Sequence, residues 1–212
     1  MQKKTMLIPK KDFEFILLSI ENHNVSPRMR FLKSFFKKNL NIPGDYFEFG
    51  VFQGNSLISV ALLFKSLGIK KKLYGFDSFG GFPGYSEYDD FKNFKKMFKN
   101  GQISKSHFKD INNFKRIKNI LSKLNNNKNS FHPKSISSSK DFSNSSYSYL
   151  KKKIKLLKLN NIELIKGDFK KTVPNFFKKY PSKRILVANM DCDLYDSYMT
   201  VFNYSWSKLS KK

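Results

Sequence analysis

Short apolar runs alternate with helical patterns along most of the chain. Four runs rich in aromatic and branched residues have the length of buried strands, and each gives way to a turn. They cover residues 46–49, 73–77, 162–169 and 185–190. Strands that alternate with helices form parallel sheets, so the pattern predicts an α/β fold with a parallel sheet flanked by helices.

Two amphipathic helical patterns, at residues 13–20 and 31–36, precede the first strand. We divide the chain into a helical leader at 1–42 and a main domain at 43–212 with an insertion at about 100–148. The leader either covers a ligand site or only caps the core. The insertion ends in an Asn-, Ser- and Lys-rich stretch, which favours a tolerated surface insertion over a substrate lid.

The first strand runs into a glycine turn and then into a helical pattern. Gly50 and Gly54 let the backbone approach a ligand, and Glu48 can accept hydrogen bonds from that ligand. The spacing Glu-x-Gly-x-x-x-Gly differs from the Gly-x-Gly-x-x-Gly of dinucleotide folds. It suits a ligand that carries a cation and lacks phosphate, such as S-adenosylmethionine. The alternative is a turn with a structural role alone.

The four strands end in carboxylates, namely Glu48, Asp77, Asp168 and Asp191. Because a parallel sheet collects its strand ends on one edge, these side chains are expected to form a negative cleft. A cationic ligand or a metal ion would relieve their repulsion. Asp77 follows Gly54 by 23 residues, about where a βαβ unit places the carboxylate that binds a ribose diol.

Asp191 and Asp193 lie two residues apart at the end of the fourth strand. On an extended strand end they point the same way, so they can share one divalent cation or act as metal ligand and base. The alternative is a helix N-cap formed by Asp193 or Asp196. Cys192, between the two acids, is expected to be a small buried hydrophobe.

A net charge of +25 raises the question of a nucleic-acid partner. The positive charge is nearly all Lys, whereas base readout and bidentate phosphate contacts favour Arg, so a nucleic-acid partner is not expected. The charge is interpreted as compositional drift, and a genuine anionic partner is the alternative. No apolar run is long enough for a membrane span, and the N-terminus lacks a signal-peptide pattern. We therefore expect a cytoplasmic protein without a membrane partner, and homo-oligomerisation stays open. The single cysteine excludes an internal disulfide.

Taken together, these motifs resemble the macrocin O-methyltransferase (TylF-type) family of S-adenosylmethionine-dependent class I methyltransferases. The matching text lies at residues 43–56, 74–83, 166–174 and 190–197. The resemblance implies a Rossmann-like methyltransferase fold and methyl transfer to a hydroxyl of a sugar or sugar-bearing small molecule, assisted by Mg²⁺.

The resemblance also implies roles for individual residues. Glu48, Gly50 and Gly54 would shape the cofactor pocket, Asp77 with the adjoining Ser78 would lie at the ribose, and Asp168 with Phe169 would border the adenine. Asp191 matches a metal ligand, and Asp193 matches an acid suggested as general base. A nucleic-acid methyltransferase and a non-catalytic fragment of the same fold are the alternatives.

Family members continue past the helix that matches residues 198–209 into a fifth strand, a further pair of aspartates and a hairpin. This chain ends at Lys212. The resemblance therefore implies a sheet that lacks the C-terminal strands, with the strand of Val187 as an exposed edge. It also predicts weak S-adenosylmethionine binding and slow turnover.

Overall fold

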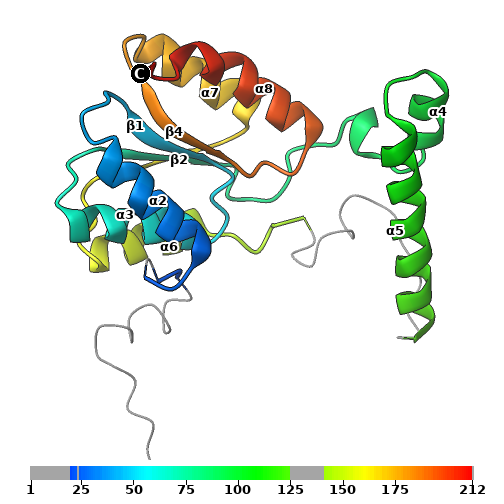
Figure 1. The fold of residues 1–212 in the computed structure, drawn as a ribbon, viewed down its shortest axis with the longest axis horizontal. Coiled ribbons are helices and arrows are strands. Elements are labelled where there is room, and N and C mark those ends of the chain that lie inside the picture. Colours follow the sequence, from blue (N-terminus) through cyan, green and yellow to red (C-terminus); the bar gives the residue numbers. More distant parts are fainter. Residues whose placement is uncertain (1–19, 23, 125–140, 212) are drawn as a thin grey trace, which may run out of the picture.

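A computed structural model of the chain describes residues 20–22, 24–124 and 141–211. Its centre is a sheet of four parallel strands in the order β3-β2-β1-β4 (Figure 1). The strands are β1 (Asp45–Phe49), β2 (Leu73–Asp77), β3 (Ile162–Lys166) and β4 (Ile185–Met190). All four predicted strands are confirmed, although β3 ends at Lys166 because the chain turns at Gly167.

Helices cover both faces of this sheet (Figure 1). One face carries α2 (Pro27–Lys38), α3 (Asn55–Leu67) and α6 (Tyr147–Leu156), whose apolar side chains form one core cluster. The other face carries α7 (Phe169–Lys179) and α8 (Tyr195–Ser205), and a second cluster lies beneath them. A short 3-10 helix, η3 (Trp206–Lys208), follows α8. The α/β architecture predicted from the sequence is therefore present.

The central strand β1 is buried on both faces because its apolar residues serve both clusters. Tyr46 belongs to the cluster under α3, and Phe47 belongs to the cluster under α7. The ring of Phe47 lies 5.6 Å from that of Phe176 and 5.8 Å from that of Phe177. Such aromatic contacts fix the position of β1, from which the following turn emerges.

The leader contributes to the same core. Met29 and Phe36 of α2 are fully buried, and the ring of Phe36 packs edge-on against Phe64 of α3 at 4.7 Å. The earlier helical pattern at residues 13–20 lies almost wholly outside the described residues. The division into leader, main domain and insertion stays a prediction.

Strand β4 lies at one edge of the sheet, as expected for the strand of Val187. On its inner side β4 pairs with β1. On its outer side, within the described part of the chain, an isolated parallel bridge joins Ile185 to Leu209, and the Ser210 amide donates to the Ile185 carbonyl at 2.9 Å.

The segment between β2 and β3 carries helices that stand away from the sheet (Figure 1). They are a 3-10 turn η1 (Glu87–Asp89), α4 (Phe94–Lys99) and α5 (Lys105–Leu124). The Asn- and Ser-rich stretch that was predicted to be exposed lies mainly at 125–140, outside the described residues. None of the described helices combines the length and the hydrophobicity needed to cross a membrane.

Candidate functional site

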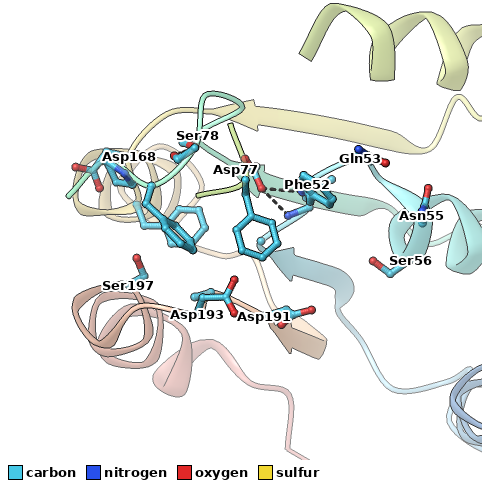
Figure 2. A pocket seen from close by; sticks show the side chains of 18 of the residues that line it. Phe52, Gln53, Asn55, Ser56, Asp77, Ser78, Asp168, Asp191, Asp193 and Ser197 are labelled. Atoms are coloured by element: carbon cyan, nitrogen blue, oxygen red, sulfur yellow. Dashed lines mark hydrogen bonds between the residues drawn. The ribbon is translucent and has the colours of Figure 1, made fainter. Parts of the chain in front are cut away.

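A cavity of about 290 Å³ lies at the carboxyl ends of the strands (Figure 2). Its walls come from the turn after β1, the loop after β2, the start of α7 and the segment between β4 and α8. The predicted site residues that line it are Gly50, Asp77, Ser78, Asp168, Phe169, Asp191 and Asp193. The fold thus brings most of the predicted site into one hollow, at the lower end of the size range of small-molecule sites.

The carboxylate of Asp77 holds the turn after β1. Its Oδ2 accepts hydrogen bonds from the amides of Val51 at 2.9 Å and Phe52 at 2.8 Å, and its Oδ1 accepts from the amide of Phe79 at 2.6 Å. A carboxylate offers about four acceptor positions, so these bonds occupy most of them. Asp77 therefore organises the backbone around the cavity and keeps about one acceptor position for a ligand.

Gly50 is required by the close approach of two strand ends. Its φ is 94°, and a Cβ at this position would collide with the Asp191 carbonyl. Gly54 has a φ of 81° and is not among the residues that line the cavity. A Cβ at this position would collide with the side chain of Leu150 of α6. The geometry of Gly54 explains helix packing, and its predicted contact with a cofactor stays a prediction.

Glu48 is fully buried and is not among the cavity-lining residues. Its Oε2 accepts from the Tyr46 hydroxyl at 2.7 Å, and its Oε1 accepts from the Ser56 hydroxyl at 2.5 Å. Burial raises the pKa of Glu48, although both hydroxyl bonds act in the opposite direction. Ser56 does line the cavity, so Glu48 meets the site through Ser56.

Asp168 serves as the N-cap of α7. Its Oδ1 accepts from the amide of Lys170 at 2.9 Å, and its backbone carbonyl accepts from the amide of Thr172. A capping carboxylate and a helix N-terminus attract each other, which fixes the side chain at the cavity wall. Phe169 follows at the first helical position and is mostly buried in the core beside the cavity.

Asp191 and Asp193 both line the cavity, and both keep part of their surface in contact with solvent. The two-residue spacing does not reflect extended strand, because β4 ends at Met190 and Asp193 has a φ of 60°. Partial burial, and then the charge of Asp191, raise the pKa of Asp193. A carboxylate whose pKa is raised is a stronger base than an ordinary aspartate.

Cys192 is buried, as expected, and its Sγ lies 3.6 Å from the carbonyl oxygen of Phe49. Burial, followed by the charges of Asp191, Asp193 and Asp77, raises the pKa of the Cys192 thiol to about 12. The thiol therefore stays protonated near neutral pH and is no nucleophile.

The N-cap alternative for Asp193 and Asp196 is wrong. Helix α8 begins at Tyr195, and its N-cap residue, Leu194, offers no capping side chain. The carboxylate of Asp89, from η1, instead accepts a hydrogen bond from the Tyr195 amide at 2.9 Å. Asp196 instead pairs with Lys170 of α7 at 2.8 Å. Asp193 consequently has no structural role as a helix cap.

Sequence reasoning missed three aromatic residues that line the cavity, Phe52, Phe82 and Phe142. The ring of Phe142 lies 5.0 Å from that of Phe52 and 5.2 Å from that of Phe82. Phe52 and Phe142 also have positive φ values, of 51° and 58°. Bulky residues rarely adopt this backbone conformation, and such outliers gather at functional sites.

The leader reaches the cavity as well. Glu21 and Arg28 both line it, and they form a salt bridge with each other. Although burial opposes the shift, the hydrogen bond from Arg28 lowers the pKa of Glu21. The described part of the leader therefore fills both roles: it packs on the core, and it borders the cavity.

Charge at the cavity is opposite to the charge of the chain. Five carboxylates, from Glu21, Asp77, Asp168, Asp191 and Asp193, line it, whereas Arg28 is the one basic residue among the described lining residues. The chain as a whole has a net charge of +25. The predicted negative cleft is present, with Glu48 just behind it rather than on its surface.

The profile of the macrocin O-methyltransferase (TylF) family matches residues 25–133, slightly more than half of the chain. The fold resembles CalS11, a calicheamicin methyltransferase, with a TM-score of 0.61 and 19% identity over 98% of this chain and 69% of that chain. It also resembles the O-methyltransferase NovP, with a TM-score of 0.55 and 20% identity over 86% of this chain and 60% of that chain. No curated protein sequence matches this chain.

The contact of Gly50 with Asp191 predicts a large effect of a single methyl group. Gly50→Ala should lower the free energy of unfolding by about 3 kcal/mol, because the new Cβ collides with backbone and the φ is unfavourable for alanine. Gly84→Ala is the matched control, since its Cβ would meet open space, and it should change stability by at most about 0.5 kcal/mol. Urea unfolding measures both, and equal effects would contradict this account of the turn.

Burial of Glu48 predicts a pH-dependent stability difference. Because burial raises its folded-state pKa above the ordinary value of 4.5, the stabilising effect of its proton is complete below about pH 4.5. That effect is lost as the pH rises through the raised pKa. Glu48→Gln cannot ionise, so the wild type should lose stability relative to Glu48→Gln as the pH increases above 4.5. Urea unfolding at several pH values checks this; a constant gap, or an equal trend in the exposed control Glu163→Gln, would refute it.

Proposed function

This chain belongs to the macrocin O-methyltransferase (TylF) family, and we propose that it transfers a methyl group from S-adenosylmethionine to a hydroxyl of a sugar or sugar-bearing small molecule. The observation that carries the proposal is the acidic cavity at the carboxyl ends of the strands. Ligands of parallel α/β sheets bind at this edge. S-adenosylmethionine carries a sulfonium and an amino group, both cationic, so it complements carboxylates.

The lining residues fit the parts of this cofactor. Gly50 lets the turn after β1 lie against the Asp191 backbone at the cavity wall, and the remaining acceptor position of Asp77 with the hydroxyl of Ser78 suits ribose hydroxyls. Phe82 and Phe142 offer aromatic surface for an adenine ring. Asp168 and Phe169, at the start of α7, complete this side of the cavity.

Asp193 is the residue we assign to proton transfer. Its carboxylate would accept the proton of the acceptor hydroxyl while that oxygen bonds to the methyl carbon. The raised pKa of Asp193 strengthens it for this task. S-adenosylmethionine supplies the electrophilic methyl group, and its sulfur keeps the electron pair of the C–S bond that breaks.

Asp191 and Asp193 also form a donor set of the kind that Mg²⁺ takes. The ion is held in proteins by one or two carboxylates, with water and substrate oxygens as further ligands. In the described ranges no three His, Cys, Asp or Glu side chains lie close enough together to hold a metal ion by themselves. Since Asp193 is assigned to proton transfer, Asp191 would be the principal protein ligand. Mg²⁺ bound there would lower the pKa of the acceptor hydroxyl.

A nucleic-acid substrate fits this cavity poorly. Five carboxylates line it, and a phosphate backbone would be repelled by them. A sugar, by contrast, is neutral, and its hydroxyl groups can donate hydrogen bonds to carboxylates. Family membership points the same way, so the sugar acceptor is the substrate class we propose.

Cofactor binding is tested by thermal unfolding with S-adenosylmethionine. A ligand that binds only the folded protein stabilises it by about 1.4 kcal/mol at ten times its dissociation constant, so the melting temperature should rise with concentration. An equimolar mixture of adenosine and methionine lacks the sulfonium and should have a smaller effect. No rise at millimolar S-adenosylmethionine would contradict the proposal.

Methyl transfer is tested with Asp193→Asn. The substitution keeps the shape of the side chain and tolerates the positive φ, but it removes the base, so turnover should fall by about 100-fold or more. The matched control is Asp196→Asn, which loses an exposed ion pair three residues away and should stay within about twofold. Transfer of a radioactive methyl group from S-adenosylmethionine to a neutral sugar glycoside gives the readout. Equal activity of the two variants would remove Asp193 from the chemistry.

A further inference from the structure

The C-terminal half of α5 carries apolar side chains that other described residues leave exposed. Ile117, Ile120 and Leu121 are 52%, 53% and 51% exposed, and Leu124 is 74% exposed. Phe114, one turn earlier, is 41% exposed. At about 100° per residue these five side chains fall on one face roughly 120° wide. We call this face the α5 apolar face.

The N-terminal half of the same helix is covered by α4. Ile111 of α5 and Met97 of α4 are both buried. The rings of Phe98 and Phe108 stack at 4.6 Å with an interplanar angle of 2°. Helix α4 ends at Lys99 and is only 6 residues long, so its cover does not extend to the end of α5. Phe114 still stacks on the ring of Phe91 at 5.9 Å, so the most exposed part of the α5 apolar face is the part that follows it, from Ile117 to Leu124.

Cations flank the α5 apolar face on both sides. From Phe114 to Leu124 the helix contains Lys115, Arg116, Lys118 and Lys123 and no acidic residue. On a helical wheel, Arg116 and Lys123 lie beside one border of the face, and Lys118 lies beside the other. This part of α5 therefore combines an apolar surface with a charge of +4 and stands away from the sheet (Figure 1).

We propose that the α5 apolar face docks on an anionic lipid surface. Charge complementarity selects this occupant: a second copy of the chain would bring a like charge of +4 against the first, and the chain carries +25 overall. Nucleic acid would satisfy the cations but would leave the apolar side chains in water. A bilayer with anionic head groups satisfies both features, because a helix of this type lies in the head-group region with its apolar side in the acyl boundary.

The helix dimensions agree with docking parallel to the membrane. From Phe114 to Leu124 the face is about 15 Å long, too short to span the roughly 30 Å hydrocarbon core. Peripheral binding needs no spanning segment, so the absence of an apolar run in the sequence does not argue against it. The expectation of a protein without a membrane partner is revised on this point.

Vesicle co-sedimentation of the full chain tests the proposal. The probes are vesicles of equal parts phosphatidylglycerol and phosphatidylcholine, compared with phosphatidylcholine alone. The wild type should partition to the anionic vesicles at least tenfold better. Ile120→Gln with Leu124→Gln keeps every charge and should lower partitioning to anionic vesicles at least tenfold, since it removes apolar burial. Arg116→Gln with Lys123→Gln should lower it by about fivefold for each cation removed.

Asn112→Gln with Asn119→Gln is the matched control, because both residues lie on the opposite side of α5, and it should bind like the wild type. Circular dichroism and melting curves should show that all variants fold, since the substituted side chains are exposed. Equal binding of the wild type and the Ile120/Leu124 variant would overturn the proposal, because the general charge of the chain would then suffice. Absence of vesicle binding would overturn it too. In that case, a wild-type dimer that dissociates when Ile120 and Leu124 are substituted would show that the face binds a second copy of the chain instead.

Discussion

The carboxylate of Asp77 is the interaction on which the site depends. By accepting the amides of Val51 and Phe52, it ties the end of β2 to the turn that leaves β1. This bond fixes where the chain turns into α3, and therefore where Ser56 meets Glu48. Gly50 allows the same turn to press against the backbone of Asp191, so three neighbouring strands share one rigid rim. Removal of this carboxylate would leave three amide donors, of Val51, Phe52 and Phe79, without their partner.

The rim concentrates features that oppose stability. Phe52, Phe142 and Asp193 have positive φ values, and the charge of Asp191 raises the pKa of Asp193. Glu48 lies fully buried behind them. Each feature costs free energy in the isolated protein, and a cationic ligand would offset the repulsion between carboxylates. The aromatic core around Phe47 holds the strands together beneath this strained edge.

Sequence reasoning predicted the strands and their acidic ends because both are local. A short apolar run and the residue that ends it are adjacent in the chain, and parallel topology then brings the ends together. The contact of Phe142 with Phe52 joins residues 90 positions apart across the α4 and α5 segment, so no local pattern indicates it. The burial of Glu48 was missed for a related reason, since it depends on Ser56 of α3 and on its neighbour Tyr46 facing the same way. The extended geometry predicted from the spacing of Asp191 and Asp193 was wrong, because Asp193 has a positive φ.

The central claim is that the acidic rim around Asp77 is where the methyl donor binds. Amide chemical-shift mapping by NMR on addition of S-adenosylmethionine tests this most directly, because it reports position as well as binding. Our account predicts the largest changes at residues 50–53, 55–56, 77–78 and 167–169, which line the cavity. Changes confined to residues distant from these segments would contradict it.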